Sequence, residues 1–512
     1  MNSLVFRVDS SIEIGTGHLY RCLNLARSFS SSNLKIFFVC RNHNGNLIDL
    51  IKNEFQVLTL AEKKIKKSED YPYLHWLGCS QIEDANDTLR ILEENNINPS
   101  FLIIDHYGID EEWENFLIKK YSKHNDFKLV VIDDLYNRNH ICDLLLDQNI
   151  IEESNPYISK TSPRTNFIFG PYFAILSKEY IHKKNFIKNK NSLKRVLIFF
   201  SGVDKNNLTL KLANLLCDKK FKNLTVDIVV GIKNKKLNDI KKISKGRKNF
   251  KLHIQIKTLT NLMLKADLAV GGGGINSWER ECMKLPTLLI SLSQHQINLS
   301  NSLKKFGKVN YLGHFDKVDE KKISCEILNE VKNFSLNKKK GIFIDGYGAK
   351  RIVILLNGLN LPLKFRRIRE FDHSLLRFWV DKFTNINSLE QILRKNDEER
   401  FLVNNIDNCP IYFISFDSES IVNLEIKILF DSYLVNENNI QLILKTSLQK
   451  VISKKIKFKL IKISIINNLC KKKFRELDLF FSRLDFMTYG ENTFLNKNCN
   501  YLQLKNLLKR II

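Results

Sequence analysis

A histidine follows a glycine-rich turn near the start of the chain, in the order Gly15, Thr16, Gly17 and His18. An apolar run at residues 4–8 precedes this turn, and helical spacing follows it in Leu19, Cys22, Leu23, Ala26 and Phe29. The pattern predicts a strand, a turn and a helix that begins at the histidine. The positive end of a helix disfavours imidazolium, and a neutral imidazole accepts a proton from water. His18 is therefore either a general base or a residue that caps the helix.

A second glycine turn lies in the middle of the chain. Residues 271–274 are four successive glycines, after an apolar run that ends at Val270 and before a helix predicted to begin near Ser277. Main-chain N–H groups in such a turn face a phosphate readily, and the helix N-terminus adds positive potential. A run of four glycines loses much conformational entropy on folding, so it is unfavourable unless another group must approach the backbone closely. We interpret the run as a cradle for a diphosphate, with a flexible turn as the alternative.

Aspartates end two of the predicted buried strands in the first third of the chain. The continuous apolar runs at residues 101–105 and 128–133 end in Asp105 and Asp133, and a second aspartate, Asp134, comes next. Such runs are typical of strands buried on both faces of a parallel sheet. Ligands of open α/β sheets bind outside the carboxyl ends of the strands. We therefore expect these aspartates, with Tyr107, to line the same crevice as His18.

The elements that position these residues alternate between short apolar runs and helical segments. The alternation occupies residues 1–182, pauses at a lysine-rich linker over residues 182–191, restarts over residues 192–360 and changes character after Pro362. We therefore predict three domains: 1–182, an N-terminal Rossmann-like lobe; 192–360, a second Rossmann-like lobe that binds the nucleotide; and 363–512. The fold class is α/β, with two doubly wound lobes and a C-terminal α+β domain.

Composition excludes several classes of protein. The 512 residues contain no run of about eighteen apolar residues, and residues 1–9 lack the pattern of a signal peptide, so we expect a cytoplasmic protein without a membrane partner. The ten cysteines form no C-x-x-C pair, which argues against a zinc site and a disulfide framework. The chain also lacks Asp-x-Asp, so we predict chemistry without a metal.

The formal net charge of +26 invites a nucleic-acid interpretation. The lysines are spread along the chain, however, which indicates compositional bias and solvated faces. A non-catalytic protein that binds nucleotide or nucleic acid stays the third hypothesis, and nucleic acid is not an expected partner. A basic surface still attracts an anionic nucleotide.

An ordered series of motifs resembles the UDP-2,4-diacetamido-2,4,6-trideoxy-β-L-altropyranose hydrolase family of pseudaminic acid biosynthesis. The motifs are residues 7–9, 15–18 with Arg21 and Cys22, 105–108, 132–135, 143–149, 169–176, 201–204, 271–274 with 277–279, and 345–349. The resemblance covers about residues 4–357 and implies a glycosyltransferase-B-like fold. It also implies that His18 activates a water that attacks the anomeric carbon with inversion, so that UDP leaves.

The expected substrate contacts come from both lobes. They are Gly15, Thr16, Gly17, Arg21, Asp105, Tyr107, Ser201, Gly202, Gly272, Gly273, Gly274, Asn276, Ser277, Glu279, His295 and Gln296. The substrate is a UDP-diacetamido-trideoxy sugar, and hydrolysis requires no cofactor. The sequence departs from the family at His295, where relatives commonly have Asn, and in the turn at residues 201–204, where relatives tend to have another glycine.

The last third resembles an acetyltransferase of the GNAT type at residues 371–379, 410–416 and 484–486. An active enzyme of this type grips the acetyl-CoA pyrophosphate with a glycine turn, and the equivalent residues 434–440 contain no glycine. We predict a degenerate GNAT-like domain, with acetyl-CoA as a cofactor only if the domain is active. The alternatives to a hydrolase are a glycosyltransferase on the same fold and a bifunctional hydrolase and N-acetyltransferase.

Overall fold

The computed structural model describes residues 3–29, 34–67, 69, 71–121, 127–151, 154–187, 190–334, 341–357, 364–368, 372–383, 400–404, 409–418, 423–430, 437–453, 460–465, 487–488 and 493–496. The chain divides into two compact units, Met1–Ala349 and Lys350–Ile512. The first unit contains two parallel sheets, and the second contains one mixed sheet.

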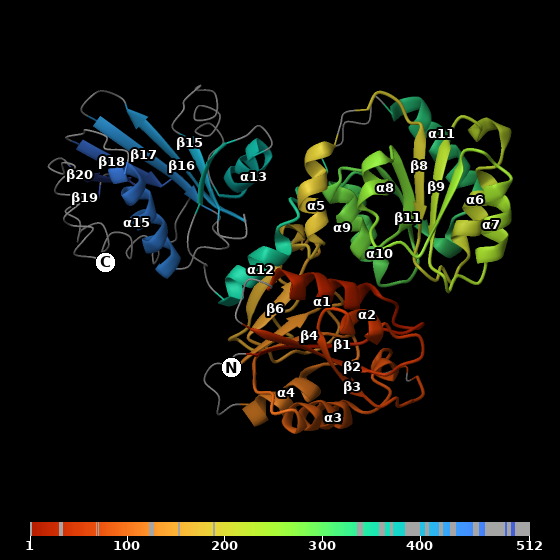
Figure 1. Ribbon diagram of the computed structural model, residues 1–512, viewed down its shortest axis with the longest axis horizontal. Helices are drawn as coiled ribbons and strands as arrows, with labels where there is room; N and C mark the ends of the chain where they lie inside the picture. The colour runs from red at the N-terminus through yellow and green to blue at the C-terminus, as the bar shows by residue number, and fades with distance from the viewer. Residues whose placement is uncertain are drawn as a thin grey trace. The chain divides into compact units, whose positions relative to one another are not determined.

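The first lobe is built on seven parallel strands in the order β3-β2-β1-β4-β5-β6-β7. Their bounds are β1 Ser3–Val8, β2 Lys35–Arg41, β3 Gln56–Leu60, β4 Pro99–Asp105, β5 Lys128–Ile132, β6 Leu144–Asp147 and β7 Asn166–Phe169. Helices α1 (Gly17–Ser28), α2 (Ile48–Lys52), α3 (Gln81–Glu94) and α4 (Glu111–Tyr121) connect them, with α3 and α4 on one face of the sheet and α1 on the other (Figure 1). All six residues of β1 are buried, because helices cover both faces.

The second lobe has six parallel strands in the order β10-β9-β8-β11-β12-β13. Their bounds are β8 Arg195–Phe199, β9 Thr225–Val230, β10 Phe250–Ile254, β11 Leu268–Gly272, β12 Thr287–Ser291 and β13 Val309–His314. Helices α6 (Leu208–Leu215), α7 (Leu237–Lys245) and α11 (Glu320–Asn333) cover one face, and α8 (Thr260–Lys265), α9 (Ile275–Cys282) and α10 (Gln296–Phe306) cover the other (Figure 1).

Both sheets reverse their strand order at one point, and these points decide where a ligand can bind. The order runs outward in both directions from β1 and β4 in the first lobe, and from β8 and β11 in the second. Such a reversal opens a crevice at the carboxyl ends of the two central strands. The fold class predicted from the sequence, two doubly wound Rossmann-like lobes, is confirmed by these sheets. His18 follows β1, and Asp105 ends β4.

The structure corrects the predicted start of the helix after the glycine run. Gly271 and Gly272 belong to β11, and α9 begins at Ile275, two residues before the predicted Ser277. Gly274 is its N-cap, with a φ of 119° that favours glycine. The turn between strand and helix therefore contains two glycines, Gly273 and Gly274, instead of four.

The predicted linker over residues 182–191 begins inside helical structure. Helix α5 (Lys178–Lys183) and the short 3-10 helix η3 (Lys184–Phe186) occupy its first half. In its second half, the Lys190 ammonium lies 2.9 Å from the Asp267 carboxylate at the start of β11. The composition predicted an interdomain linker because lysine and asparagine dominate it, and the described part of this linker contains helical turns and an ion pair to the second lobe. The predicted domain boundaries stay predictions.

The second unit contains a mixed sheet in the order β14-β15-β16-β17-β18-β20-β19. Its strands are β14 Lys364–Arg367, β15 Arg400–Asn404, β16 Pro410–Ser418, β17 Asn423–Phe430, β18 Leu460–Ile465, β19 Met487–Thr488 and β20 Thr493–Asn496, with helices α13 (His373–Phe383) and α15 (Glu437–Ser453). Helix α12 (Gly348–Asn357) begins at the end of the first unit. The predicted strand at 410–416 is confirmed, as β16.

Two parts of the acetyltransferase comparison, residues 434–436 of the turn and residues 484–486, lie outside the described residues, as does Phe371. The GNAT-like identity of this unit stays a prediction. No helix in the described part of the chain is long and apolar enough to cross a membrane.

Candidate active site

The centre of the candidate site is a histidine paired with a buried carboxylate. His18 is the second residue of α1, and its Nδ1 lies 2.6 Å from Oδ1 of Asp105, the last residue of β4. Asp105 is fully buried, whereas the His18 side chain is 11% exposed. A hydrogen on Nδ1 that is donated to the carboxylate leaves Nε2 as the acceptor. Thr16 is the N-cap of α1, so the alternative of a capping histidine is wrong.

Arg21 holds the carboxylate of this pair in its charged form. One helical turn after His18, its Nε donates to Asp105 Oδ2 at 2.7 Å, and its Nη2 donates to Oδ1 at 2.6 Å. Burial by itself would raise the pKa of Asp105, but Arg21 and then His18 outweigh it and hold that pKa well below its usual value. The carboxylate therefore stays negative, and it orients the neighbouring imidazole.

Tyr107 joins this pair to the surface of the first lobe. Its ring meets the His18 ring edge to face, with 4.5 Å between the ring centroids. Its hydroxyl donates to Asp134 Oδ1 at 2.5 Å, and Asp134 also lies 3.5 Å from Nη1 of Arg21. Arg138 donates to the backbone carbonyl of Tyr107. His18, Arg21, Tyr107, Asp105 and Asp134 thus form one contiguous cluster. Asp133, also expected in the crevice, is buried instead and accepts hydrogen bonds from Arg138 and Tyr157.

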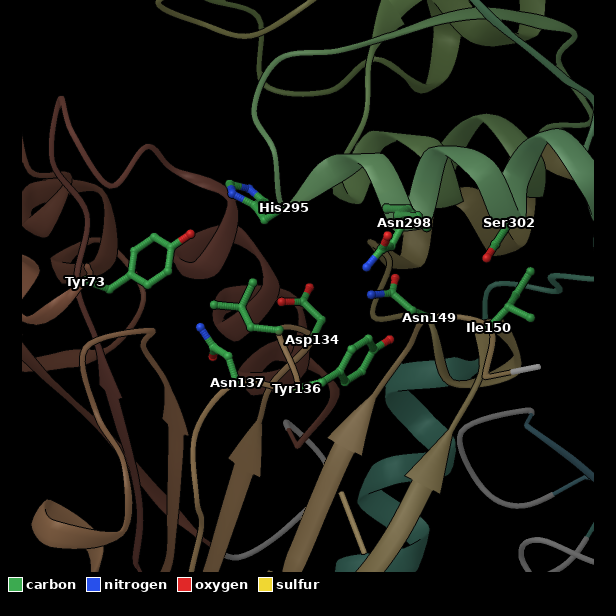
Figure 2. A pocket seen from close by; sticks show the side chains of 11 residues that line it. Tyr73, Asp134, Tyr136, Asn137, Asn149, Ile150, His295, Asn298 and Ser302 are labelled. Carbon is green, nitrogen blue, oxygen red and sulfur yellow. The ribbon is translucent and has the colours of Figure 1, made fainter. Parts of the chain in front are cut away.

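A pocket of about 250 Å³ lies between the two lobes, next to this cluster. The first lobe lines it with Tyr73, Asp134, Leu135, Tyr136, Asn137, Asn149 and Ile150, and the second with His295, Asn298, Leu299 and Ser302. Figure 2 shows His295 and Asn298 on the wall formed by the start of α10, opposite Asp134 and Asn149. Asp134 belongs both to the pocket wall and to the histidine cluster, so it connects the two.

His295 brings the second lobe to the histidine cluster. It precedes α10, and its ring centroid lies 6.0 Å from that of Tyr107. The His295 side chain is exposed to solvent, and its Nε2 lies 3.2 Å from Oγ of Ser293 in the same loop. The sequence predicted this histidine as a substrate contact, and the structure places it on the pocket wall.

The glycine turn packs against Gln296, the residue that follows His295. The Gln296 Oε1 accepts from the backbone N–H of Leu292 at 2.9 Å, and a Cβ built on Gly273 would lie 3.2 Å from the same oxygen. Gly272, also predicted to contact substrate, is buried in β11 instead, where a Cβ would lie 2.8 Å from the Leu292 side chain. The half of the glycine run that lies outside the strand is thus Gly273 and Gly274.

Three predicted contacts on α9 find partners within the protein. The Ser277 hydroxyl is buried and accepts from Nη2 of Arg280 at 3.1 Å. Asn276 Nδ2 donates to Glu279 Oε2 at 2.5 Å, and burial raises the pKa of Glu279. Arg280 also donates to the backbone carbonyl of Gly272 at 2.6 Å. These side chains hold the helix start against β11.

The remaining predicted residues lie in two turns. At the end of β8, the Ser201 hydroxyl accepts from the backbone N–H of Asp204 at 2.7 Å, and the exposed Gly202 accepts from the backbone N–H of Gly231 at 2.9 Å. These bonds shape the turn of the second lobe that flanks the β8–β11 crevice. In the first lobe, Gly15 has a φ of 83°, and its N–H donates to the Ser11 carbonyl at 2.9 Å, so Gly15, Thr16 and Gly17 form the tight turn before His18.

The aromatic residues beside His18 were not predicted as site residues from the sequence. Trp76 stacks on Tyr107 with 5.6 Å between ring centroids, and Tyr73, which lines the pocket, lies 4.9 Å from Trp76. The concentration of rings in residues 71–76, outside any predicted strand or helix, was the available signal. Asp134 was expected in the crevice but was not selected as a contact.

A buried network of charges joins β1, β2 and α3 in the first lobe. Arg7 in β1 donates to both carboxylate oxygens of Asp84 in α3, at 3.0 and 2.8 Å, and Arg41 at the end of β2 donates to Asp84 at 2.6 Å. Arg7 also lies 2.8 Å from Asp9. Burial of Asp9 opposes its charge, but Arg7 holds the pKa of Asp9 well below its usual value. This network ties α3 to the strand ends that carry the histidine turn.

No group of three or more His, Cys, Asp or Glu side chains in the described part of the chain is arranged to hold a metal ion.

Comparisons with known proteins find curated relatives and a set of solved structures with similar folds. The chain matches no family model. It is 27% identical over 260 residues to the UDP-2,4-diacetamido-2,4,6-trideoxy-beta-L-altropyranose hydrolase of Campylobacter jejuni, a match that spans 51% of this chain and 81% of that protein. It is 21% identical over 360 residues to the spore coat polysaccharide biosynthesis protein SpsG of Bacillus subtilis, spanning 69% of this chain and 96% of that protein. Among solved structures, MurG of Acinetobacter baumannii aligns with 70% of this chain and 100% of its own, at a TM-score of 0.46 and 8% identity.

Proposed function

We propose that this chain hydrolyses a UDP-2,4-diacetamido-2,4,6-trideoxyhexose and releases UDP and the free sugar for pseudaminic acid biosynthesis. The observation that carries the proposal is the 2.6 Å contact between His18 Nδ1 and the Asp105 carboxylate, because it prepares Nε2 to accept a proton. The 27% identity to a hydrolase of such a sugar supports the substrate class.

In the proposed reaction, His18 Nε2 takes a proton from water while the water oxygen forms a bond to the anomeric carbon. The bond from that carbon to the diphosphate oxygen breaks on the opposite side, so the configuration inverts and the electron pair leaves with UDP. Asp105, itself held by Arg21 at 2.6 and 2.7 Å, stabilises the imidazolium that forms. No atom of the enzyme bonds covalently to the sugar.

We place the diphosphate at Gly273 and Gly274, where the start of α9 presents backbone N–H groups. Donors that are already oriented stabilise the charge that develops on a leaving group. The sequence without Asp-x-Asp supports a reaction that needs no divalent cation. The turn at Ser201 and Gly202 flanks the same crevice of the second lobe, because β8 and β11 are neighbours in the sheet.

We place the sugar in the pocket between the lobes. The pocket volume of about 250 Å³ is below the roughly 300–1,000 Å³ of ordinary ligand pockets, so it suits one part of a nucleotide sugar rather than the whole. Asn137, Asn149 and Asn298 supply amide donors and acceptors, and the carboxylate of Asp134 supplies a further acceptor. Acetamido substituents need both kinds of partner.

The test is UDP release by the full-length chain from a UDP-diacetamido sugar without any acceptor. We expect His18→Asn to lower kcat by about 10²- to 10⁴-fold, because this change removes the general base. The variant should still bind UDP in calorimetry. His182→Asn, at an exposed histidine of α5, is the matched control and should keep full activity.

Two results would count against the proposal. Full activity of His18→Asn would show that another group activates water. UDP release that starts only after a second sugar is added would show a glycosyltransferase. Nuclear magnetic resonance of the first-formed sugar anomer tests the predicted inversion.

A further inference from the structure

The proposed reaction uses His18 as the base and gives no role to a second histidine, His295. It lies on the pocket wall of the second lobe, while His18 belongs to the first lobe, and the ring of Tyr107 contacts both histidines, with centroid distances of 6.0 and 4.5 Å. The charged and titratable groups that face it are Asp134 after β5, His18 in α1 and Tyr107 after β4. One site therefore contains two imidazoles, contributed by opposite lobes.

The neighbouring residue joins His295 to the glycine turn. Gln296 follows it at the start of α10, and its side chain packs against Gly273 and Gly274, where Cβ atoms would lie 3.2 and 3.7 Å from the Gln296 amide. His295 thus lies between the cluster that activates water and the turn where we place the diphosphate. With the diphosphate placed at this turn, His295 is the imidazole contributed by the same lobe as the leaving group.

We propose that His295 donates a proton to the diphosphate oxygen that leaves the sugar, while His18 accepts a proton from the attacking water. This inference rests on the proposed function. The protons balance: one passes from water to His18, one passes from His295 to UDP, and both imidazoles then exchange with solvent. The two histidines act as base and acid, each from its own lobe.

The surroundings of His295 predict a proton uptake when an anion binds. In the unliganded protein, desolvation by the residues around it lowers the pKa of His295, Asp134 opposes this effect, and His18 adds to it. A diphosphate beside the ring brings negative charge, which favours the imidazolium form and raises the pKa. UDP binding near neutral pH should therefore load His295 with the proton that it donates in the proposed step.

The first experiment measures this uptake without catalysis. Titration calorimetry with UDP at pH 7, in two buffers with different ionisation enthalpies, gives the number of protons bound. We expect the wild-type chain to take up more protons than His295→Asn, and the control His182→Asn to resemble wild type. Comparison of variants cancels the ionisation of UDP itself. Equal uptake by wild type and His295→Asn would overturn the proposal.

The second experiment measures turnover of the UDP-sugar. We expect His295→Asn to lower kcat by about 10²-fold or more, with a much smaller change in KM, because the asparagine amide donates a hydrogen bond without transferring a proton. A kcat within twofold of wild type would overturn the role of His295 while leaving that of His18 intact. If no variant or wild-type protein hydrolyses any UDP-sugar, the proposed function fails, and the calorimetric result still decides whether His295 meets the diphosphate.

Discussion

A single buried carboxyl group next to the pocket should shape the pH dependence of stability. Asp147 ends β6 and is fully buried, and its Oδ1 accepts from the backbone N–H of Asn149 at 2.8 Å. The Tyr157 hydroxyl lies between two carboxylates, 3.1 Å from Asp133 and 3.3 Å from Asp147. Burial, with the negative charge of Asp134 nearby, raises the pKa of Asp147 to about 8. The folded protein therefore keeps this group protonated at neutral pH.

This pKa predicts that Asp147 lowers stability as the pH rises. The unfolded chain loses the proton near pH 4 and the folded chain near pH 8, so the folded state binds more protons in this window. The contribution of Asp147 to the free energy of unfolding then falls by up to about 1.4 kcal/mol per pH unit. Asp147→Asn keeps the neutral form, so its stability relative to wild type should increase between pH 5 and pH 8.

Urea unfolding at pH 5, 6.5 and 8 measures this difference. Asp49→Asn, at a fully exposed carboxyl in α2, is the control and should show no such trend. A constant difference between Asp147→Asn and wild type across this range would contradict the prediction.

At the scale of residues, contacts within one lobe were easier to predict from the sequence than contacts between the two lobes. His18, Asp105 and Tyr107 follow or end the strands β1 and β4, and the position of strand ends is readable from buried apolar runs. Tyr73 and Asn298 line one pocket although 225 positions separate them, and this contact depends on how the two lobes pack. Local patterns contain no information on that packing.

At the scale of elements, the glycine run shows how one sequence feature serves two purposes. A Cβ on Gly271 would lie 2.4 Å from the Phe199 carbonyl oxygen and 2.8 Å from Nη1 of Arg280. This glycine is needed because β8 and the Arg280 side chain approach β11 closely, whereas Gly274 is needed for its positive φ. Only the requirement at Gly274, its positive φ, concerns the start of α9 and a bound anion.

Gly271→Ala should therefore destabilise the fold by about 1–3 kcal/mol, the usual cost of adding a methyl group to a filled core. The measurement is denaturant unfolding, with UDP binding tested on the folded protein, where we expect little change. Gly17→Ala is the matched control, because no heavy atom lies within 4 Å of its added Cβ. As the first residue of α1, alanine there should leave stability unchanged or raise it by up to about 1 kcal/mol. Equal losses from both substitutions would contradict this assignment.

Elements were predictable where burial is continuous. The predicted strands that became β1, β4, β5 and β11 are central or nearly central in their sheets, and their runs are predominantly apolar. The strands β3, β7, β10 and β13, which lie at sheet edges, were not predicted from the sequence. Edge strands mix exposed and buried positions, as β10 does with the exposed Lys251 and Ile254, so no continuous apolar run marks them.

At the scale of the whole molecule, every candidate site residue belongs to the unit Met1–Ala349. A ligand that binds only the folded form stabilises that form, by about 2.7 kcal/mol at a hundredfold excess over Kd. UDP should thus slow hydrogen exchange in α1, α9 and α10 and leave β16 and β17 unchanged. Hydrogen-exchange mass spectrometry with and without UDP measures this, with inorganic phosphate at equal concentration as the control. Equal slowing in both units would contradict a site confined to the first.

The division of the pocket between two lobes also has a consequence for the rate of turnover. Under the proposed function, a nucleotide sugar extends beyond a space of about 250 Å³, so we expect it to enter while the lobes are apart and UDP to depart the same way. Separation of this kind takes microseconds to milliseconds and often limits well-evolved enzymes. When the chemical step is faster than the separation of the lobes, the separation limits kcat. Solvent viscosity slows such a movement, so kcat should fall in proportion to viscosity when sucrose is added.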